Sequence, residues 1–179
     1  NVCQQCPDFA YPMIGLHPEE VKANYKEILE KMKETLLASS KYIAVGEVGL
    51  DFYWNREFEK EQLEAFEEQV KWSIETRLPL MIHCRKAQNE MVKILKKYQS
   101  QLPGGVFHCF TGNEKEAAEL LSFNNFVLGI GGVLTFKKSN LPETLKSVSL
   151  QRIVLETDSP YMAPVPLRGK RNESSFLVH

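Results

Sequence analysis

The sequence predicts an α/β fold in which parallel strands alternate with helices. Short apolar runs rich in Val, Ile and Gly recur along the 179 residues, and amphipathic stretches separate most of them. The runs are continuously apolar rather than alternating, as strands of a buried parallel sheet are. Their centres lie roughly 20–36 residues apart, which is about the length of one βα unit. This spacing is compatible with a doubly wound open sheet and with a (β/α)₈ barrel.

Each predicted element rests on a local pattern. Helices need apolar residues at a spacing of three and four, with a capping residue at the start. Pro18 suits a first helical turn, and Asn113 with Glu116 can form a capping box. The predicted strands are 12–16, 42–50, 79–83, 105–110, 126–133 and 152–156. The predicted helices are 18–37, 56–76, 87–98, 113–123 and 141–148.

Composition restricts the class of protein. A net charge of −1 does not indicate a general nucleic-acid binder, so any phosphate-binding surface must be local or must depend on metal ions. No apolar run reaches the length of a membrane helix, and we expect a cytoplasmic protein with one domain, no membrane contact and no obligate protein partner. Cys84 and Cys109 each follow a histidine in an apolar run, so we expect both to be small buried residues facing away from that histidine. Cys3 and Cys6 form an isolated C-x-x-C with no second pair at zinc spacing.

Polar residues occupy the ends of the predicted strands, where apolar packing would not select them. Glu47 is the clearest case, because it interrupts the run "IAVGEVGLDF" and burying an unpaired carboxylate is costly. Carboxylates and imidazoles converging from separate strands would form a divalent metal site of N/O type. A salt bridge from Glu47 to Arg85, and histidines that are ordinary core residues, are the simpler readings. The residues at strand ends are His17, Glu47, Asp51, His83, Arg85, His108, Glu156 and Asp158.

The motifs "GLHPEE", "GEVGLDFYW", "PLMIHCRKA", "GVFHCFTGN" and "ETDSPYMAPVP" with "RGKRNE" resemble the TatD family of metal-dependent deoxyribonucleases. They follow the family's order and spacing from Pro12 to Glu173. The resemblance implies a TIM (β/α)₈ barrel of the metallo-dependent hydrolase type, with two divalent ions at the mouth of the barrel. It also implies hydrolysis of DNA phosphodiester bonds, often exonucleolytic.

The resemblance also implies roles for individual residues. Glu47 corresponds to the carboxylate that bridges both metals, and His83 and His108 correspond to ligands of one metal. Asp158 corresponds to the aspartate that binds the other metal and orients or deprotonates the attacking water, so Glu47 and Asp158 are the expected catalytic residues. His17 corresponds to a histidine that contacts the substrate phosphate. Arg85 could help to hold phosphate, and Asp51 and Glu156 could form hydrogen bonds with the metal ligands without touching the metal.

The sequence differs from the family pattern in two respects. It contains no H-x-H pair, which the family carries on its first strand, and it lacks the family's C-terminal helices. We therefore expect residues 1–179 to form a single TatD-like hydrolase domain that is a truncated barrel, with about six of eight strands.

The function expected from this resemblance is two-metal hydrolysis of DNA, in which a metal-activated water attacks the phosphodiester bond. Zn²⁺ and Mn²⁺ suit histidine and carboxylate ligands, whereas Mg²⁺ prefers more oxygen ligands. One alternative is an amidohydrolase-type enzyme acting on a small ester, amide or lactone. Another is a catalytically impaired barrel fragment that only binds metal or a partner.

Overall fold

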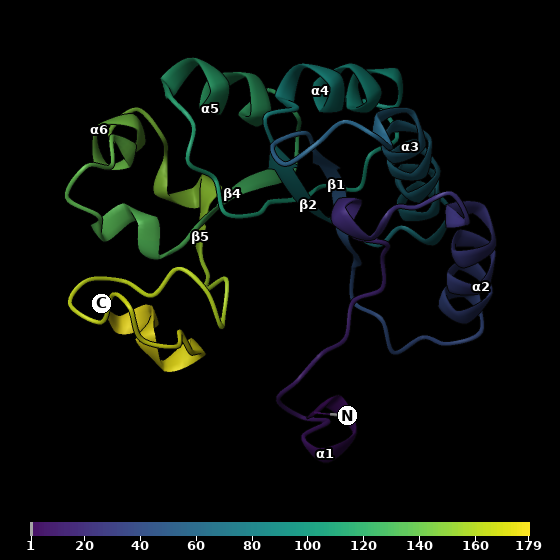
Figure 1. Ribbon diagram of the computed structural model, residues 1–179, viewed down its shortest axis with the longest axis horizontal. Helices are drawn as coiled ribbons and strands as arrows, with labels where there is room; N and C mark the ends of the chain where they lie inside the picture. Colours follow the sequence, from purple (N-terminus) through teal and green to yellow (C-terminus); the bar gives the residue numbers. More distant parts are fainter. Residues whose placement is uncertain (1) are drawn as a thin grey trace. The chain divides into compact units, whose positions relative to one another are not determined.

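The computed structural model describes residues 2–179, which form two compact units. The first unit runs to Gly105 and the second from Val106 to His179. Strand β3 (Gly105–Phe107) lies where one unit passes into the other along the chain. Figure 1 labels the helices and strands of both units. The described residues confirm an α/β architecture with parallel strand pairing in each unit.

In the first unit, two parallel strands are joined by a long helix. Helix α3 packs on β1, and α2 lies against α3 (Figure 1). Trp72 and Phe66 of α3 are fully buried and supply much of the apolar contact with the strands. The elements are α1 (Val2–Gln5), the 3₁₀ turn η1 (Pro18–Glu20), α2 (Tyr25–Leu37), β1 (Val45–Asp51), α3 (Glu59–Thr76), β2 (Leu80–Arg85) and α4 (Gln88–Lys97).

The predicted helix over 18–37 is interrupted. Pro18 begins a single 3₁₀ turn, and Val21 then adopts an extended conformation with ψ of 119°. Val21 is buried, so the extended residue places an apolar side chain in the core before α2 begins at Tyr25. Helical spacing alone could not reveal this break.

The predicted strand over 12–16 is present only as a short hydrogen-bonded segment. Ile14 forms an isolated parallel bridge with Val45, and its N–H donates to the carbonyl of Ala44. The ladder cannot extend to Leu16, because the Gln69 side chain accepts from the Leu16 N–H at 2.6 Å and donates to its carbonyl at 3.3 Å. The described residues therefore form five strands rather than six.

Strand β1 contains a bulge at the position of Glu47. Val45 pairs with Leu80, but Val48 pairs with Ile82, so β1 has one more residue than β2 in this interval. A bulge redirects a side chain relative to the regular alternation of a strand. Glu47 is consequently about one-third exposed, at 31% of its side-chain surface, within an otherwise buried strand.

The second unit contains a second parallel pair, in which Leu128 of β4 pairs with Ile153 of β5. The predicted capping box at the start of α5 is confirmed, because Asn113 accepts from the Glu116 N–H while the Glu116 carboxylate accepts from the Asn113 N–H. The remaining elements are α5 (Glu114–Leu121), β4 (Phe126–Ile130), η2 (Gly132–Thr135), α6 (Leu141–Leu145), η3 (Leu150–Arg152), β5 (Ile153–Leu155) and η4 (Ser174–Val178).

Within residues 2–179, none of the helices is long and apolar enough to cross a membrane.

Candidate metal centres

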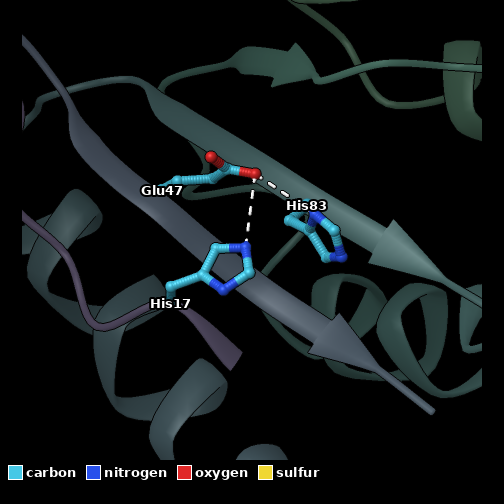
Figure 2. A group of neighbouring side chains, drawn as sticks. All are labelled: His17, Glu47 and His83. Carbon is cyan, nitrogen blue, oxygen red and sulfur yellow. Dashed lines mark hydrogen bonds and ion pairs between the residues drawn. The ribbon is translucent and has the colours of Figure 1, made fainter. Parts of the chain in front are cut away.

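The first unit brings together three of the residues predicted at strand ends. Glu47 Oε1 lies 3.2 Å from His83 Nδ1 and 3.6 Å from His17 Nε2 (Figure 2). Glu47 comes from the bulge of β1, His83 from β2, and His17 from the residue before η1. Ligands of a tetrahedral ion with bonds of about 2.0–2.1 Å lie roughly 3.3 Å apart, so the separation between Glu47 Oε1 and His83 Nδ1 fits a divalent cation. We call His17, Glu47 and His83 the first cluster.

Asp51 supports His83 from the opposite side of its ring. The side chain of Asp51 is only 2% exposed, and its Oδ2 lies 2.8 Å from His83 Nε2. A carboxylate in this position accepts the ring N–H and leaves the other nitrogen with its lone pair directed outward. His83 Nδ1 therefore faces Glu47 with a free lone pair, which an imidazole nitrogen needs in order to bind a metal ion. This is the supporting role expected for Asp51 from the sequence.

The charge state of His83 follows from the same contacts. Burial lowers the pKa of His83, but the hydrogen bonds with Glu47 and Asp51 oppose it, and the pKa is raised overall. Glu47 and Asp51 therefore stabilise positive charge at this ring. The same two carboxylates would stabilise the charge of a divalent cation bound at His83 Nδ1.

The tautomer of His17 indicates a different role for this residue. Its Nδ1 accepts from the Glu19 N–H at 3.3 Å, which places the ring proton of neutral His17 on Nε2. An N–H at Nε2 can donate to an anionic oxygen but cannot bind a metal ion. The 3.6 Å separation from Glu47 is too long for a direct hydrogen bond, so this donor is available to a ligand.

Glycine is required beside the first cluster. Gly49 has φ of +143°, a conformation that L side chains rarely adopt, and a Cβ there would collide with the carbonyl oxygen of His83. The two strands therefore approach each other closely at the register pair Gly49–His83. This approach keeps the imidazole of His83 close to the strand that carries Glu47.

The second unit contains a similar arrangement around His108. Its Nδ1 lies 2.7 Å from Glu156 Oε2, and its Nε2 lies 3.5 Å from Asp158 Oδ1. Burial lowers the pKa of His108, but hydrogen bonds with Asp158 and Glu156 raise it well above its usual range. Glu156 thus relates to His108 as Asp51 relates to His83. We call His108, Cys109 and Glu156 the second cluster, after the residues whose ligand atoms lie within 4.8 Å of one another.

The expectation that Cys109 faces away from His108 is wrong. Strand β3 ends at Phe107, and Cys109 has φ of +47°, so the alternation of a strand no longer applies. The Cys109 N–H donates to Glu156 Oε1, and its sulfur lies in the second cluster. Cys84 and Cys109 are also half-buried rather than buried. Burial raises the pKa of the Cys109 thiol.

The structure places the other predicted residues as follows. Arg85 ends β2 and stacks on an aromatic ring rather than pairing with Glu47. Asp158 lies beside His108 in the second unit. Shared metal binding by His83 and His108, and a bridging role for Glu47, involve residues of both units and stay predictions.

Comparison with known proteins identifies the family. The family model of TatD related DNase matches residues 1–179. "Uncharacterized metal-dependent hydrolase YabD" of Bacillus subtilis is 41% identical over 173 residues, which cover 96% of this chain and 67% of the relative. "3'-5' ssDNA/RNA exonuclease TatD" of Edwardsiella piscicida is 35% identical over 185 residues, covering 100% of this chain and 70% of the relative.

Solved structures agree with this assignment. YjjV, a TatD homologue from Escherichia coli, superposes with a TM-score of 0.87 at 27% identity, covering 97% of this chain and 68% of that chain. A TatD family hydrolase from Entamoeba histolytica superposes with a TM-score of 0.70 at 25% identity, covering 90% of this chain and 56% of that chain. The chain thus spans 56–70% of the length of these relatives, with 61% for a metal-dependent hydrolase of Buchnera aphidicola.

The fold and its clusters of imidazoles and carboxylates resemble those of the TIM-barrel class of metal-dependent hydrolases. The chain belongs to the TatD family of related DNases.

Proposed function

We propose that the chain carries the catalytic residues of a metal-dependent nuclease that hydrolyses phosphodiester bonds of DNA. The main support is the geometry at His83, where Asp51 lies 2.8 Å from one ring nitrogen and Glu47 lies 3.2 Å from the other. This arrangement is typical of a metal-binding histidine with its supporting carboxylate. The printed name of the Edwardsiella relative, an exonuclease of single-stranded DNA and RNA, supports a nucleic acid as substrate.

Each cluster would hold a divalent cation through residues of its own unit. In the first, Glu47 Oε1 and His83 Nδ1 are the ligand atoms. In the second unit, the ligand atoms would be His108 Nε2 and Asp158 Oδ1, which lies outside the second cluster, and Glu156 of that cluster would hold the ring of His108 in place. A divalent ion bound there supplies a water of lowered pKa and neutralises charge on phosphate oxygens. Nitrogen and carboxylate donors favour Zn²⁺ or Mn²⁺ over Mg²⁺.

His17 and Asp158 would act directly on the substrate or the water. The Nε2–H of His17 faces Glu47 Oε1 at 3.6 Å without a direct hydrogen bond, and it would donate to a phosphate oxygen that enters beside the two side chains. Asp158 is more than one-third exposed, so its carboxylate can reach an attacking water and accept its proton.

The test is cleavage of an end-labelled single-stranded DNA oligonucleotide with Zn²⁺, Mn²⁺ or Mg²⁺, compared with EDTA. We expect metal-dependent release of nucleotides, and the order of product lengths would give the polarity. Parallel assays with a lactone and an aryl ester distinguish the amidohydrolase alternative. Turnover of those substrates with no cleavage of DNA would overturn the proposal.

A further inference from the structure

Two exposed aromatic residues follow directly after the support of His83. Tyr53 is 48% exposed and Trp54 is 70% exposed, and their rings contact each other edge to face at 4.8 Å between centroids. The Tyr53 N–H donates to Asp51 Oδ1 at 2.9 Å, while the other oxygen of that carboxylate faces His83. The aromatic pair is therefore held at the first cluster through a single buried carboxylate.

Arg85 completes this surface. Its guanidinium carbon lies 3.6 Å from the centroid of the Tyr53 ring and 5.4 Å from that of Trp54. Arg85 follows His83 by two residues on β2, so both side chains leave the same face of the strand. Among residues 2–179, the Arg85 side chain makes no ion pair, and a guanidinium stacked on an aromatic ring keeps its edge N–H donors available.

We propose that Tyr53, Trp54 and Arg85 form a stacking platform for an unpaired nucleobase of single-stranded nucleic acid. The base stacks on the indole of Trp54, and Arg85 donates to the phosphate next to it. This inference rests on the proposed function, since it names the form of nucleic acid that the same site takes. In a duplex the faces of the bases are covered by their neighbours, so only an unstacked strand offers a base to the platform.

The platform predicts tolerance of base identity. Every base has a π-face, and the platform offers stacking and a phosphate donor rather than a set of hydrogen-bonding groups for a base edge. Stacking next to a phosphate-binding histidine would position the strand with a phosphodiester bond at the first cluster.

Intrinsic fluorescence tests the platform without catalysis. The chain has two tryptophans, and Trp72 is fully buried in α3, so a bound base can quench only Trp54. The probe is a phosphorothioate oligothymidine in EDTA, compared with an abasic oligomer carrying the same number of phosphates and with a duplex. We expect quenching by oligothymidine in the wild type and in Trp72→Phe, little quenching by the abasic oligomer or the duplex, and a loss of the quenching in Trp54→Phe.

Steady-state kinetics, with whichever of Zn²⁺, Mn²⁺ or Mg²⁺ supports the fastest cleavage by the wild type, provide the second measurement. Trp54→Ala should raise KM for a single-stranded oligonucleotide about five- to a hundredfold, the range for loss of one base–aromatic stack. Phe9→Ala removes an aromatic residue outside the platform that is even more exposed, at 85%, and is the matched control. Equal quenching by the abasic oligomer, or an unchanged KM in Trp54→Ala, would overturn the platform. Quenching in EDTA with no cleavage of any nucleic acid by the wild type would instead overturn the proposed nuclease function.

Discussion

Asp51 and His83 form the contact that organises the first cluster, with Oδ2 of one 2.8 Å from Nε2 of the other. The second oxygen of Asp51 is occupied by the Tyr53 N–H, so the carboxylate has a fixed orientation. The neutral imidazole, which is the form that binds a metal ion, is consequently held in one tautomer, and its remaining nitrogen faces Glu47. The orientation of a metal ligand thus depends on a buried residue that would not itself touch the metal.

Asp51→Asn tests this relationship. The Asn oxygen can still accept from the Tyr53 N–H, so its amide N–H₂ would face His83 Nε2 and favour the tautomer with the proton on Nδ1. We expect the affinity for Zn²⁺, measured by calorimetry, to fall about 10–100-fold. Asp8→Asn, at an exposed position, is the control. Wild-type affinity in Asp51→Asn would mean that Asp51 does not set the tautomer.

Glu47→Gln removes the charge that faces both imidazoles of the first cluster. Because a neutral amide is a poor ligand for a divalent ion, metal-dependent cleavage should fall by more than about 100-fold. Glu47 is partly exposed, so the melting temperature measured by circular dichroism should change little. Glu30→Gln on the exposed surface of α2 is the matched control. A variant that retains full activity would show that Glu47 has only a structural role.

Gly129→Ala tests the second cluster through packing. A Cβ at Gly129 would collide with the Glu156 carboxylate, whose Cδ would lie 2.6 Å away. The flexible side chain of Glu156 can move aside, and His108 then loses its support. We expect the affinity of the site at His108 for a divalent ion to fall about 10–100-fold, with little change in the free energy of unfolding. At Gly131 an added Cβ would meet its nearest atom at 3.5 Å, so Gly131→Ala should behave as the wild type.

Tyr25 provides a prediction for stability at high pH. Burial, together with the hydrogen bond to Glu64, raises the pKa of Tyr25 from 10.0 to about 12. A group whose pKa is raised by folding contributes stability that is complete below its unfolded pKa and is lost as pH rises through the folded pKa. Urea denaturation should therefore show that Tyr25→Phe destabilises the protein below pH 10, and that the difference from the wild type shrinks between pH 10 and about 12.

Glu64→Gln should weaken the contribution of Tyr25 to stability, because the uncharged amide oxygen of Gln accepts a weaker hydrogen bond from the Tyr25 O–H than a carboxylate does. Its pKa is lowered chiefly by the hydrogen bond from Tyr25, so the carboxylate is the acceptor over most of the pH range. A double-mutant cycle of Tyr25→Phe and Glu64→Gln isolates the pair. A coupling free energy between Tyr25 and Glu64 that does not decline above pH 10 would contradict the conclusion that their hydrogen bond raises the pKa of Tyr25.

The sequence alone predicted the α/β class of fold and singled out His17, Glu47, His83 and His108 as polar residues at strand ends, although it missed Cys109. The spacing of apolar residues predicted the helices apart from the break before Tyr25, and the pair Asn113 and Glu116 predicted the capping box, because both patterns depend on contacts within one element. The polar residues at strand ends were equally visible, since apolar packing does not select Glu47 or His83 in those positions. The resemblance to the TatD family came from the same motifs.

Only the tertiary structure decided how these residues meet. The bulge that redirects Glu47 is defined by the pairing of β1 with β2, and the contact of Gln69 with Leu16 joins residues 53 positions apart. The positive φ of Cys109, which brings its sulfur to Glu156, has no local sequence signal because Cys does not favour that conformation. The tautomers of His17 and His83 are likewise set by partners whose distances no sequence pattern encodes.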